Sequence, residues 1–319
     1  YSTWDGSSPR TIQGYTLQNY GNVSFGTVTL LKATENSINT PYVELGLTVG
    51  TDNVRKAAIR AGVPKDTTGL LADPTTVLGT ASPTALDMAH AYSTFAARGE
   101  RADLSLITQV KTPDKQIDYE LEPETTQEFD VDVMDNVNFA LQQVVNVGTG
   151  TTALGLGRPS AGKTGTTDNN MSAWYVGYTP QLATAVMMAK SDKDGNMVTL
   201  EGTGGLSSVT GGSFPAQIWT AFNRGALEGL PVETFPMPGT WVGTGDIYPS
   251  TSPSTSPSLS PSEETLPSGE ISETPQEPTP TPTQTPTEQE QTIEPSVTPS
   301  QRAVPPPSPS GAVSPSFSP

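Results

Sequence analysis

Three strand-length runs follow one another in the second half of the chain, at residues 162–166, 173–178 and 182–189. Turn-forming residues separate them, with Asp168-Asn169-Asn170 after the first run and Thr179-Pro180 after the second. Strand runs joined by such short connections are typical of antiparallel neighbours. The pattern therefore predicts an antiparallel meander against which the rest of the domain packs.

Helical patterns flank this meander in the sequence. Their apolar residues recur at intervals of three and four, and we expect helices over residues 27–35, 40–50, 51–61, 82–99 and 131–147. A final helix is expected to begin near Pro215, with Ile218, Trp219 and Phe222 on its buried face. Helices before the sheet and a closing helix after it indicate an α+β fold, with the antiparallel sheet packed between helices.

The composition divides the chain into three parts. Residues 1–228 carry the periodic patterns, residues 229–248 are expected to form a linker, and residues 249–319 are mostly Pro, Ser, Thr and Glu. Beyond residue 248, eight glutamates stand against a single basic residue, Arg302. Such a segment cannot bury enough apolar surface to offset the entropy of ordering it. We therefore expect a disordered tail that acts as a spacer or a stalk.

Charge and composition exclude several classes of function. A formal net charge of -17 argues against nucleic acid as a partner, because a phosphate backbone requires a basic surface. The chain has no cysteine and one histidine, His90, which lies within a helical pattern. A structural role for His90 is therefore favoured over a catalytic triad, and no metal site or cofactor is expected.

Lys163 lies among small and hydroxylated residues in the first strand run, and three motifs overlap on it. Residues 157–164 match the phosphate-loop pattern G-x-x-x-x-G-K-T. Residues 160–163 match S-x-x-K, a serine nucleophile with a lysine base. Residues 163–165 match K-T-G, an anion-binding edge strand of serine acyltransferases. A solvated lysine at a sheet edge would satisfy the same letters without any chemistry.

Two of the three interpretations require neighbouring secondary structure that the sequence does not predict. A phosphate loop requires a strand before it and a helix directly after it, but here a helical pattern precedes and strands follow. An S-x-x-K serine belongs at the start of a helix, whereas Ser160 precedes a strand pattern, and Gly162 would weaken a helix by about 1 kcal/mol. The K-T-G interpretation is favoured, since Thr164 and Thr166 can donate hydroxyl hydrogen bonds to a carboxylate and Gly165 allows close backbone approach.

A second motif far upstream supports this choice. Ser37-Ile38-Asn39 matches S-x-N, the partner that K-T-G chemistry requires, and Gly148-Thr149-Gly150 lies between the two. With the sequences around them, from Gly26 to Pro41 and from Ala161 to Pro180, these motifs resemble the transpeptidase domains of penicillin-binding proteins. The likeness runs from about residue 15 to residue 228 and is closest to bifunctional class A members, and the tail is similar to those of actinobacterial members.

The resemblance implies a fold, an activity and roles. The fold is that of the serine β-lactamases and D,D-transpeptidases, with a five-stranded sheet packed between helices. The activity is D,D-transpeptidation of peptidoglycan stem peptides ending in D-Ala-D-Ala, outside the cell membrane, with β-lactams as inhibitors. The roles implied are proton relay for Ser37, substrate-amide binding for Asn39 and a positive potential for Lys163. Thr164 and Thr166 would bind the substrate carboxylate, Gly165 would let the substrate approach the strand, and the Thr166 N–H would donate to the oxyanion.

One motif of the family is missing. No S-x-x-K precedes Ser37, and the sequence begins at Tyr1 without a signal peptide or an apolar run of about 20 residues. We therefore expect the nucleophile, the glycosyltransferase domain of class A relatives and the membrane anchor to lie upstream, and this chain alone to be inactive. Two alternatives remain open: hydrolysis, as in a D,D-carboxypeptidase or β-lactamase, and a non-catalytic wall-binding or scaffold role.

Overall fold

The structure is a computed structural model that describes residues 2–114 and 117–239. The predicted tail, residues 249–319, and the second half of the predicted linker lie outside the described residues. In the first half of that linker, Phe235 is buried and packs edge-on against Tyr178, with 5.6 Å between the ring centroids.

The meander is confirmed. Its strands are β9 (Ala161–Thr166), β10 (Ser172–Thr179) and β11 (Leu182–Ser191), each antiparallel to the next, and a short β12 (Met197–Val198) pairs with the end of β11. The sheet order is β12-β11-β10-β9, so β9 is an edge strand among the described residues. The described chain contributes four strands to this sheet, where the resemblance implies five.

Six α-helices are described: α1 (Leu30–Glu35), α2 (Asn39–Val49), α3 (Thr51–Ala61), α4 (Ala85–Ala96), α5 (Val131–Asn146) and α6 (Phe214–Ala226). They correspond to the expected helices, although α4 begins at Ala85 rather than residue 82 and ends at Ala96 rather than residue 99. A larger difference lies at the start of the first helix. Residues 27–29 were expected in the first helix, but they form strand β4 (Thr27–Thr29), which pairs with β1 (Thr3–Asp5). The Thr29 hydroxyl then caps α1 by accepting from the Lys32 N–H.

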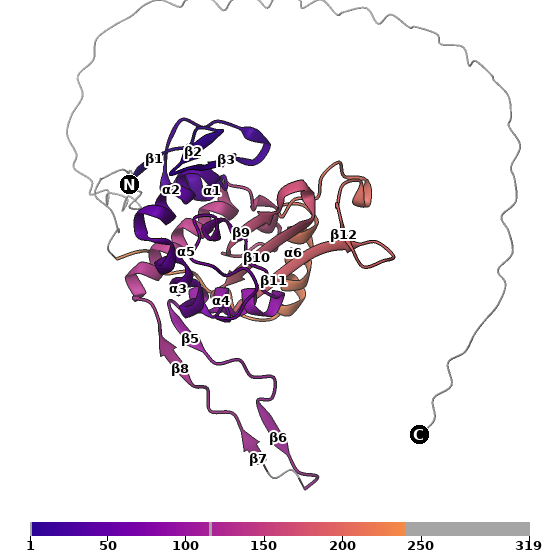
Figure 1. The fold of residues 1–319 in the computed structure, drawn as a ribbon. Helices are drawn as coiled ribbons and strands as arrows, with labels where there is room; N and C mark the ends of the chain where they lie inside the picture. Colours follow the sequence, from indigo (N-terminus) through magenta and orange to yellow (C-terminus); the bar gives the residue numbers. More distant parts are fainter. Residues whose placement is uncertain (1, 115–116, 240–319) are drawn as a thin grey trace, which may run out of the picture. The chain divides into compact units, whose positions relative to one another are not determined.

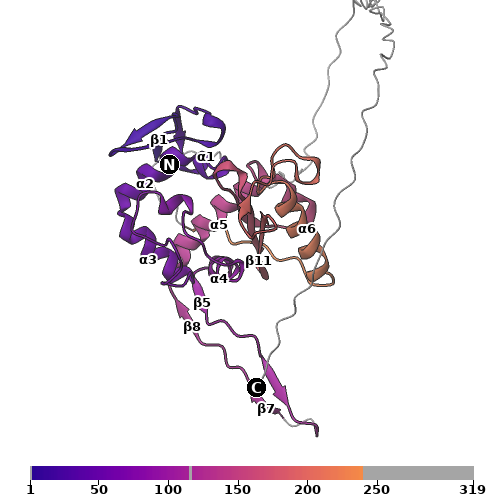
Figure 2. The same ribbon diagram turned by 45° about the vertical axis from the view of Figure 1, so that its right-hand side comes forward.

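The sheet lies between two helical layers, as expected (Figure 2). Side chains of β10 alternate between the layers: Tyr175 packs against Trp219 of α6, and Tyr178 packs against Tyr92 of α4, with centroid distances of 5.3 and 6.0 Å. The expected buried face of α6 is wrong in two positions, because Ile218 and Phe222 are about half exposed whereas Trp219 is fully buried. Small and polar residues of α6 (Ala216, Thr220 and Asn223) complete its buried face.

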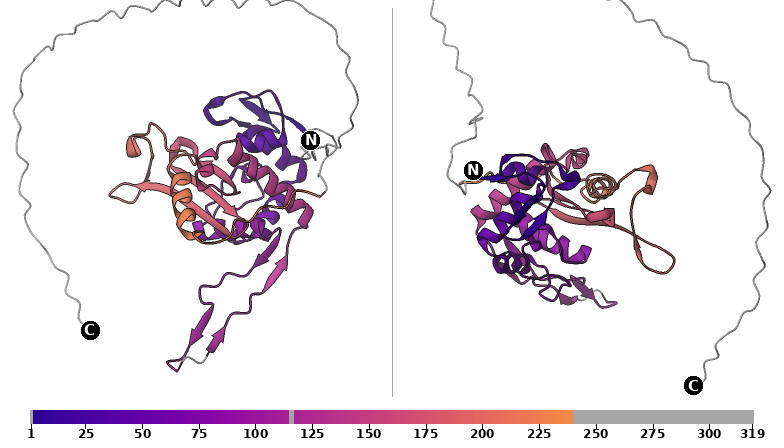
Figure 3. Two further views of the ribbon diagram at one scale, coloured as in Figure 1. Left: turned by 180° about the vertical axis from the view of Figure 1, so that it is seen from behind. Right: turned by 45° about the horizontal axis from the view of Figure 1, so that its top comes forward.

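Two smaller features lie outside this core. The hairpin of β2 (Arg10–Ile12) and β3 (Tyr15–Leu17) lies near α2 (Figure 1). A longer arm leaves the body between α4 and α5 (Figure 1 and the left view of Figure 3). The arm consists of two short ladders, β5 (Glu100–Ala102) with β8 (Thr125–Gln127) and β6 (Gln109–Lys111) with β7 (Ile117–Glu120). No helix within the described ranges is long and apolar enough to cross a membrane.

Candidate active site

Ser37 occupies the turn that ends α1, in a conformation that favours glycine. Its φ is +55°, its N–H donates to the carbonyl of Thr34 over 3.3 Å, and the N–H of Ile38 donates to that of Ala33 over 2.9 Å. This pair of bonds is a Schellman motif, whose left-handed position is usually glycine. A serine there costs about 1–2 kcal/mol of backbone strain. The strain points to a function for the hydroxyl that glycine cannot supply.

Lys163 reaches this hydroxyl from the sheet. Its Nζ donates to Ser37 Oγ over 2.7 Å and to the carbonyl of Thr164 over 3.0 Å. Burial lowers the pKa of the Lys163 ammonium to about 8. Among the described residues no carboxylate forms an ion pair with this ammonium, so its positive potential is not neutralised at short range. The structure thus brings together the first residues of the two predicted motifs, Ser37 of S-x-N and Lys163 of K-T-G.

Asn39, the third residue of the S-x-N motif, is the first residue of α2. Its side-chain amide donates to the carbonyl of Gln18 over 2.9 Å, and its own N–H donates to Asn19 Oδ1 over 3.0 Å. Asn19 Oδ1 also accepts from the N–H of Thr40, so a side chain twenty residues away caps the start of α2. An amide nitrogen carries two hydrogens, so Asn39 can hold the Gln18 carbonyl with one N–H and offer the other to a ligand, as its expected role requires.

Asn19 is a residue that sequence reasoning missed. It is 4% exposed, and its Nδ2 donates to the carbonyls of Gly6 and Val23, each over 2.9 Å. One buried side chain therefore ties the N-terminal strands to the S-x-N turn. No local pattern signals this cap, because capping signals are read from the residues adjoining the helix itself.

The two threonines of β9 are held by groups from other segments. The hydroxyl of Thr164 shares a 2.6 Å hydrogen bond with that of Thr149, and Thr166 Oγ1 accepts from the N–H of Gly211 over 3.3 Å. The Gly211–Gly212 segment lies directly against β9, since a Cβ on Gly211 would come within 2.8 Å of the nitrogen of Gly165. Thr149 and Gly211 were not predicted as site residues.

The alternation of bonded and non-bonded pairs between β9 and β10 determines which backbone groups of β9 face away from β10. Thr167 N–H donates to the carbonyl of Ser172, and bonded pairs alternate with non-bonded pairs along an antiparallel ladder. Thr164 and Thr166 therefore occupy non-bonded positions opposite β10, with their N–H and C=O groups directed toward the free edge. The Thr164 carbonyl is therefore available to accept the hydrogen bond from Lys163 Nζ.

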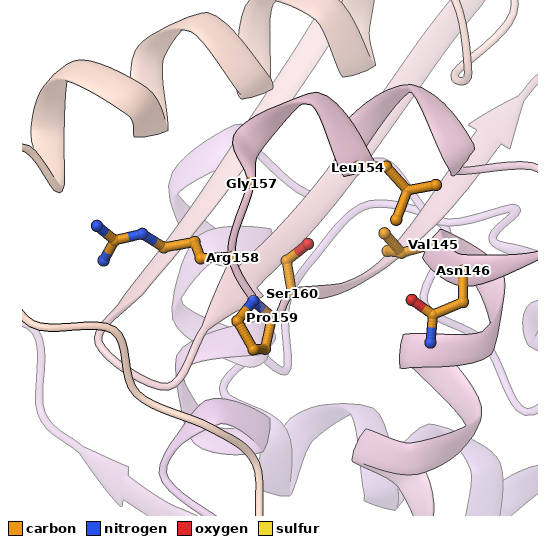
Figure 4. A pocket seen from close by; sticks show the side chains of 7 residues that line it. All are labelled: Val145, Asn146, Leu154, Gly157, Arg158, Pro159 and Ser160. Carbon is orange, nitrogen blue, oxygen red and sulfur yellow. The ribbon is translucent and has the colours of Figure 1, made fainter.

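The two competing interpretations of Lys163 are wrong. A phosphate loop needs a helix after its lysine, but Lys163 and Thr164 lie within strand β9. Ser160 is no partner of Lys163 either. Ser160 lines a separate pocket of about 390 Å³, beside Gly157 and Leu154 (Figure 4). Its buried hydroxyl has no hydrogen-bond partner among the described residues. Lys163 is absent from that lining.

His90 has a structural contact. One of its ring nitrogens, Nε2, lies 2.8 Å from the carbonyl oxygen of Ala102, which joins α4 to strand β5 of the arm. The described residues contain no group of three His, Cys, Asp or Glu side chains placed to hold a metal ion.

Comparisons with known proteins agree with this geometry. The family model described as the penicillin binding protein transpeptidase domain matches residues 1–206. Penicillin-binding protein 1A of Mycolicibacterium smegmatis is 35% identical over 252 residues, which cover 73% of this chain and 32% of that protein. Penicillin-binding protein 1A of Mycobacterium tuberculosis is 33% identical, with 73% of this chain and 30% of that protein covered. The chain thus spans about a third of the length of these relatives.

A solved structure extends the likeness to three dimensions. The penicillin-binding protein PonA1 from Mycobacterium tuberculosis superposes with a TM-score of 0.66 at 31% identity, over 75% of this chain and 66% of the compared one. The same protein in complex with penicillin V gives a TM-score of 0.63 at 30% identity, over 77% of this chain and 69% of the compared one. With the family model covering most of the described residues, the chain belongs to the penicillin-binding protein transpeptidase family.

Proposed function

We propose that this chain supplies one wall of a peptidoglycan D,D-transpeptidase site. The observation that carries the proposal is the 2.7 Å hydrogen bond from Lys163 Nζ to Ser37 Oγ, because it joins the K-T-G strand to the S-x-N turn at the edge of the sheet. Complexes with penicillin V in a related structure support β-lactams as ligands of the same site.

The reaction proceeds in two steps through a covalent intermediate. A serine hydroxyl attacks the carbonyl of the penultimate D-Ala of a donor stem peptide, the bond to the terminal D-Ala breaks, and the serine proton passes to the leaving amine. An acceptor amine then attacks the acyl-serine ester, forms the crosslinking amide, and returns a proton to the serine. Neither step consumes an oxidant, a reductant or a nucleotide.

Residues of this chain assist the two steps in different ways. Ser37 relays the proton toward the leaving amine, and Lys163 holds Ser37 and supplies positive potential. Asn39 binds the amide of the donor peptide, and the hydroxyls of Thr164 and Thr166 bind its terminal carboxylate. The outward N–H of Thr166 acts as a donor to the oxyanion that forms on the attacked carbonyl, a contribution worth about 3 kcal/mol in other acyl-transfer enzymes. Gly165 keeps the strand free of a side chain where the substrate lies.

The nucleophile is proposed to come from sequence outside these residues. No S-x-x-K precedes Ser37, and the matched relatives are about three times as long as the aligned part. An upstream segment would provide the serine and its lysine base, and a glycosyltransferase domain and a membrane anchor would precede it. The site then acts at the outer side of the cell membrane, facing the wall.

The proposal is tested with fluorescent penicillin on the protein that also contains the upstream nucleophile segment, which is called the completed domain. We expect covalent labelling, with rates lowered on the order of 10²-fold or more in Lys163→Met and Ser37→Ala. Lys190→Met is the matched control, since Lys190 is an exposed lysine of β11 and its loss should leave the rate unchanged. Normal labelling of Lys163→Met contradicts the proposal.

Product analysis with an acceptor amine separates transfer from the hydrolysis of a carboxypeptidase or β-lactamase. A completed domain that penicillin does not label indicates a scaffold.

A further inference from the structure

Thr149 connects the two motifs of the site. Its N–H donates to the carbonyl of Glu35 over 3.0 Å, two residues before Ser37, and its hydroxyl lies 2.6 Å from that of Thr164 in the K-T-G strand. Thr149 is exposed, so its side chain is accessible to a ligand of the site. A single residue thus spans the distance between the end of α1 and the edge of β9.

Glycines on both sides fix the backbone of Thr149. A Cβ on Gly148 would collide with the carbonyl of Glu35, and a Cβ on Gly212 would come within 2.5 Å of the Thr149 carbonyl oxygen. The N–H of Gly150 donates to the carbonyl of Val144 over 2.9 Å, which anchors the segment to α5. Because neighbouring segments hold the backbone on each side, the hydroxyl of Thr149 is delivered to Thr164 at a set position.

The direction of the Thr149–Thr164 hydrogen bond has a chemical consequence. Each hydroxyl carries one proton, so only one of the two threonines can donate in the pair. If Thr164 donated to Thr149, it would have no proton left for a substrate. If Thr149 donates, the proton of Thr164 is free to point into the cleft, where a carboxylate, which only accepts, can bind it.

We propose that Thr149 is a specificity-determining residue of the carboxylate subsite. It donates to Thr164 Oγ1 and thereby aims the Thr164 proton at the terminal carboxylate of the donor peptide or of a β-lactam. The inference rests on the proposed function, because that function puts a carboxylate at Thr164. It adds a selectivity for ligands with a free carboxylate over the same ligands as esters or amides.

Two substitutions separate this role from a structural one. Thr149→Val keeps the shape and removes the hydroxyl, whereas Thr149→Ser keeps the hydroxyl. In the protein with the completed domain, we expect Thr149→Val to lower the acylation rate constant for a penicillin about three- to tenfold, the effect of one lost hydrogen bond. The rate constant for the penicillin methyl ester should not change, and Thr149→Ser should react like the wild type with both. Equal losses for acid and ester, or no loss for the acid, overturn the inference.

A binding measurement distinguishes failure of the inference from failure of the proposed function. The Thr164 methyl signal of this chain is followed by NMR while a tripeptide ending in D-Ala-D-Ala, or its C-terminal amide, is added. We expect saturable shifts with the acid that weaken about three- to tenfold in Thr149→Val, and weaker shifts with the amide that the substitution leaves unchanged. If penicillin fails to acylate the completed domain but this pattern appears, the inference holds and the function is wrong. If the acid produces no shift, or the substitution does not weaken it, the inference is wrong.

Discussion

Lys163 and Ser37 are 126 positions apart in the sequence, and the hydrogen bond between them is 2.7 Å long. The contact joins two segments of different kinds, an edge strand and the turn between two helices. Each end carries an unfavourable feature, a desolvated ammonium at Lys163 and a left-handed backbone at Ser37. Paired unfavourable features of this kind are found at functional sites, where they are stabilised by the surrounding structure.

Ser37→Gly should increase stability and strongly slow acylation. Glycine adopts a φ of +55° without the steric cost that serine pays. We expect the free energy of unfolding to rise by up to about 1 kcal/mol, while penicillin acylation of the completed domain falls on the order of 10²-fold. Gln13→Gly is the control, because Gln13 has a similar φ of +48° in the exposed β2–β3 turn. It should gain stability with no loss of acylation. Unimpaired acylation of Ser37→Gly would exclude a role for the hydroxyl.

The buried ammonium of Lys163 should leave a pH-dependent signature on stability. Burial lowers its pKa from 10.5 to about 8, so the folded state binds this proton less tightly than the unfolded state. The cost of burying the charge is fully present below about pH 8 and is relieved as the pH rises to about 10.5. Subtracting the free energy of unfolding of Lys163→Met from that of the wild type cancels the other titrating groups. We expect the difference to rise by about 1–3 kcal/mol over this window.

Urea denaturation of both proteins at about pH 7.5 and about pH 10 measures this difference. A difference that stays constant, or that falls as the pH rises, would show that the ammonium of Lys163 is not desolvated in the folded protein.

Gly211→Ala should disrupt the support of β9. Its new methyl group would collide with the carbonyl of Trp174 and approach the nitrogen of Gly165 to 2.8 Å. Backbone atoms cannot yield as a flexible side chain does, so we expect a loss of about 2–3 kcal/mol in the free energy of unfolding, together with slower acylation. Gly225→Ala is matched to it, because nothing lies within 4 Å of the added methyl group in α6. That protein should be unchanged or more stable by up to about 1 kcal/mol, and equal stability of the two variants would contradict the close packing at Gly211.

Asn19→Ala should weaken the S-x-N turn from a distance. It removes two hydrogen bonds to the start of α2 and two to the N-terminal segment, and it takes the acceptor from the N–H groups of Asn39 and Thr40. We expect a loss of about 2–4 kcal/mol by chemical denaturation and slower acylation. Asn53→Ala removes a single bond at an exposed position and should cost less than about 1 kcal/mol. A loss no larger than that of Asn53→Ala would show that Asn19 does not hold the turn.

The sheet and the lysine motif were predictable because their signals are local. Strand-length runs and the turn residues between them define β9 to β11, and the resemblance carried by Ser37-Ile38-Asn39 placed the partner of Lys163. Contacts set by tertiary packing were not predictable. The capping of α2 by Asn19 and the bond between Thr149 and Thr164 depend on segments that meet only in the folded chain.

The face of α6 shows the same limit. Ile218 and Phe222 are the more obvious apolar positions, yet they are about half exposed, whereas Trp219 is buried with its indole N–H donating to the carbonyl of Gly177 over 3.0 Å. Gly177 leaves room for that ring, because a Cβ there would come within 3.0 Å of it. A hydrophobic pattern indicates that a helix has a buried face, but the shape of the opposing sheet selects which residues form it.

The serine that penicillin acylates decides whether the nucleophile lies outside this chain or within it. The protein with the completed domain is labelled with penicillin and digested, and the modified peptide is identified by mass spectrometry, with this chain alone treated in parallel. We predict that the label lies on a serine of an S-x-x-K motif outside these 319 residues, and that this chain alone remains unlabelled. A label on Ser37 or Ser160 would contradict the assignment of Ser37 and Lys163 as supporting groups of an upstream nucleophile.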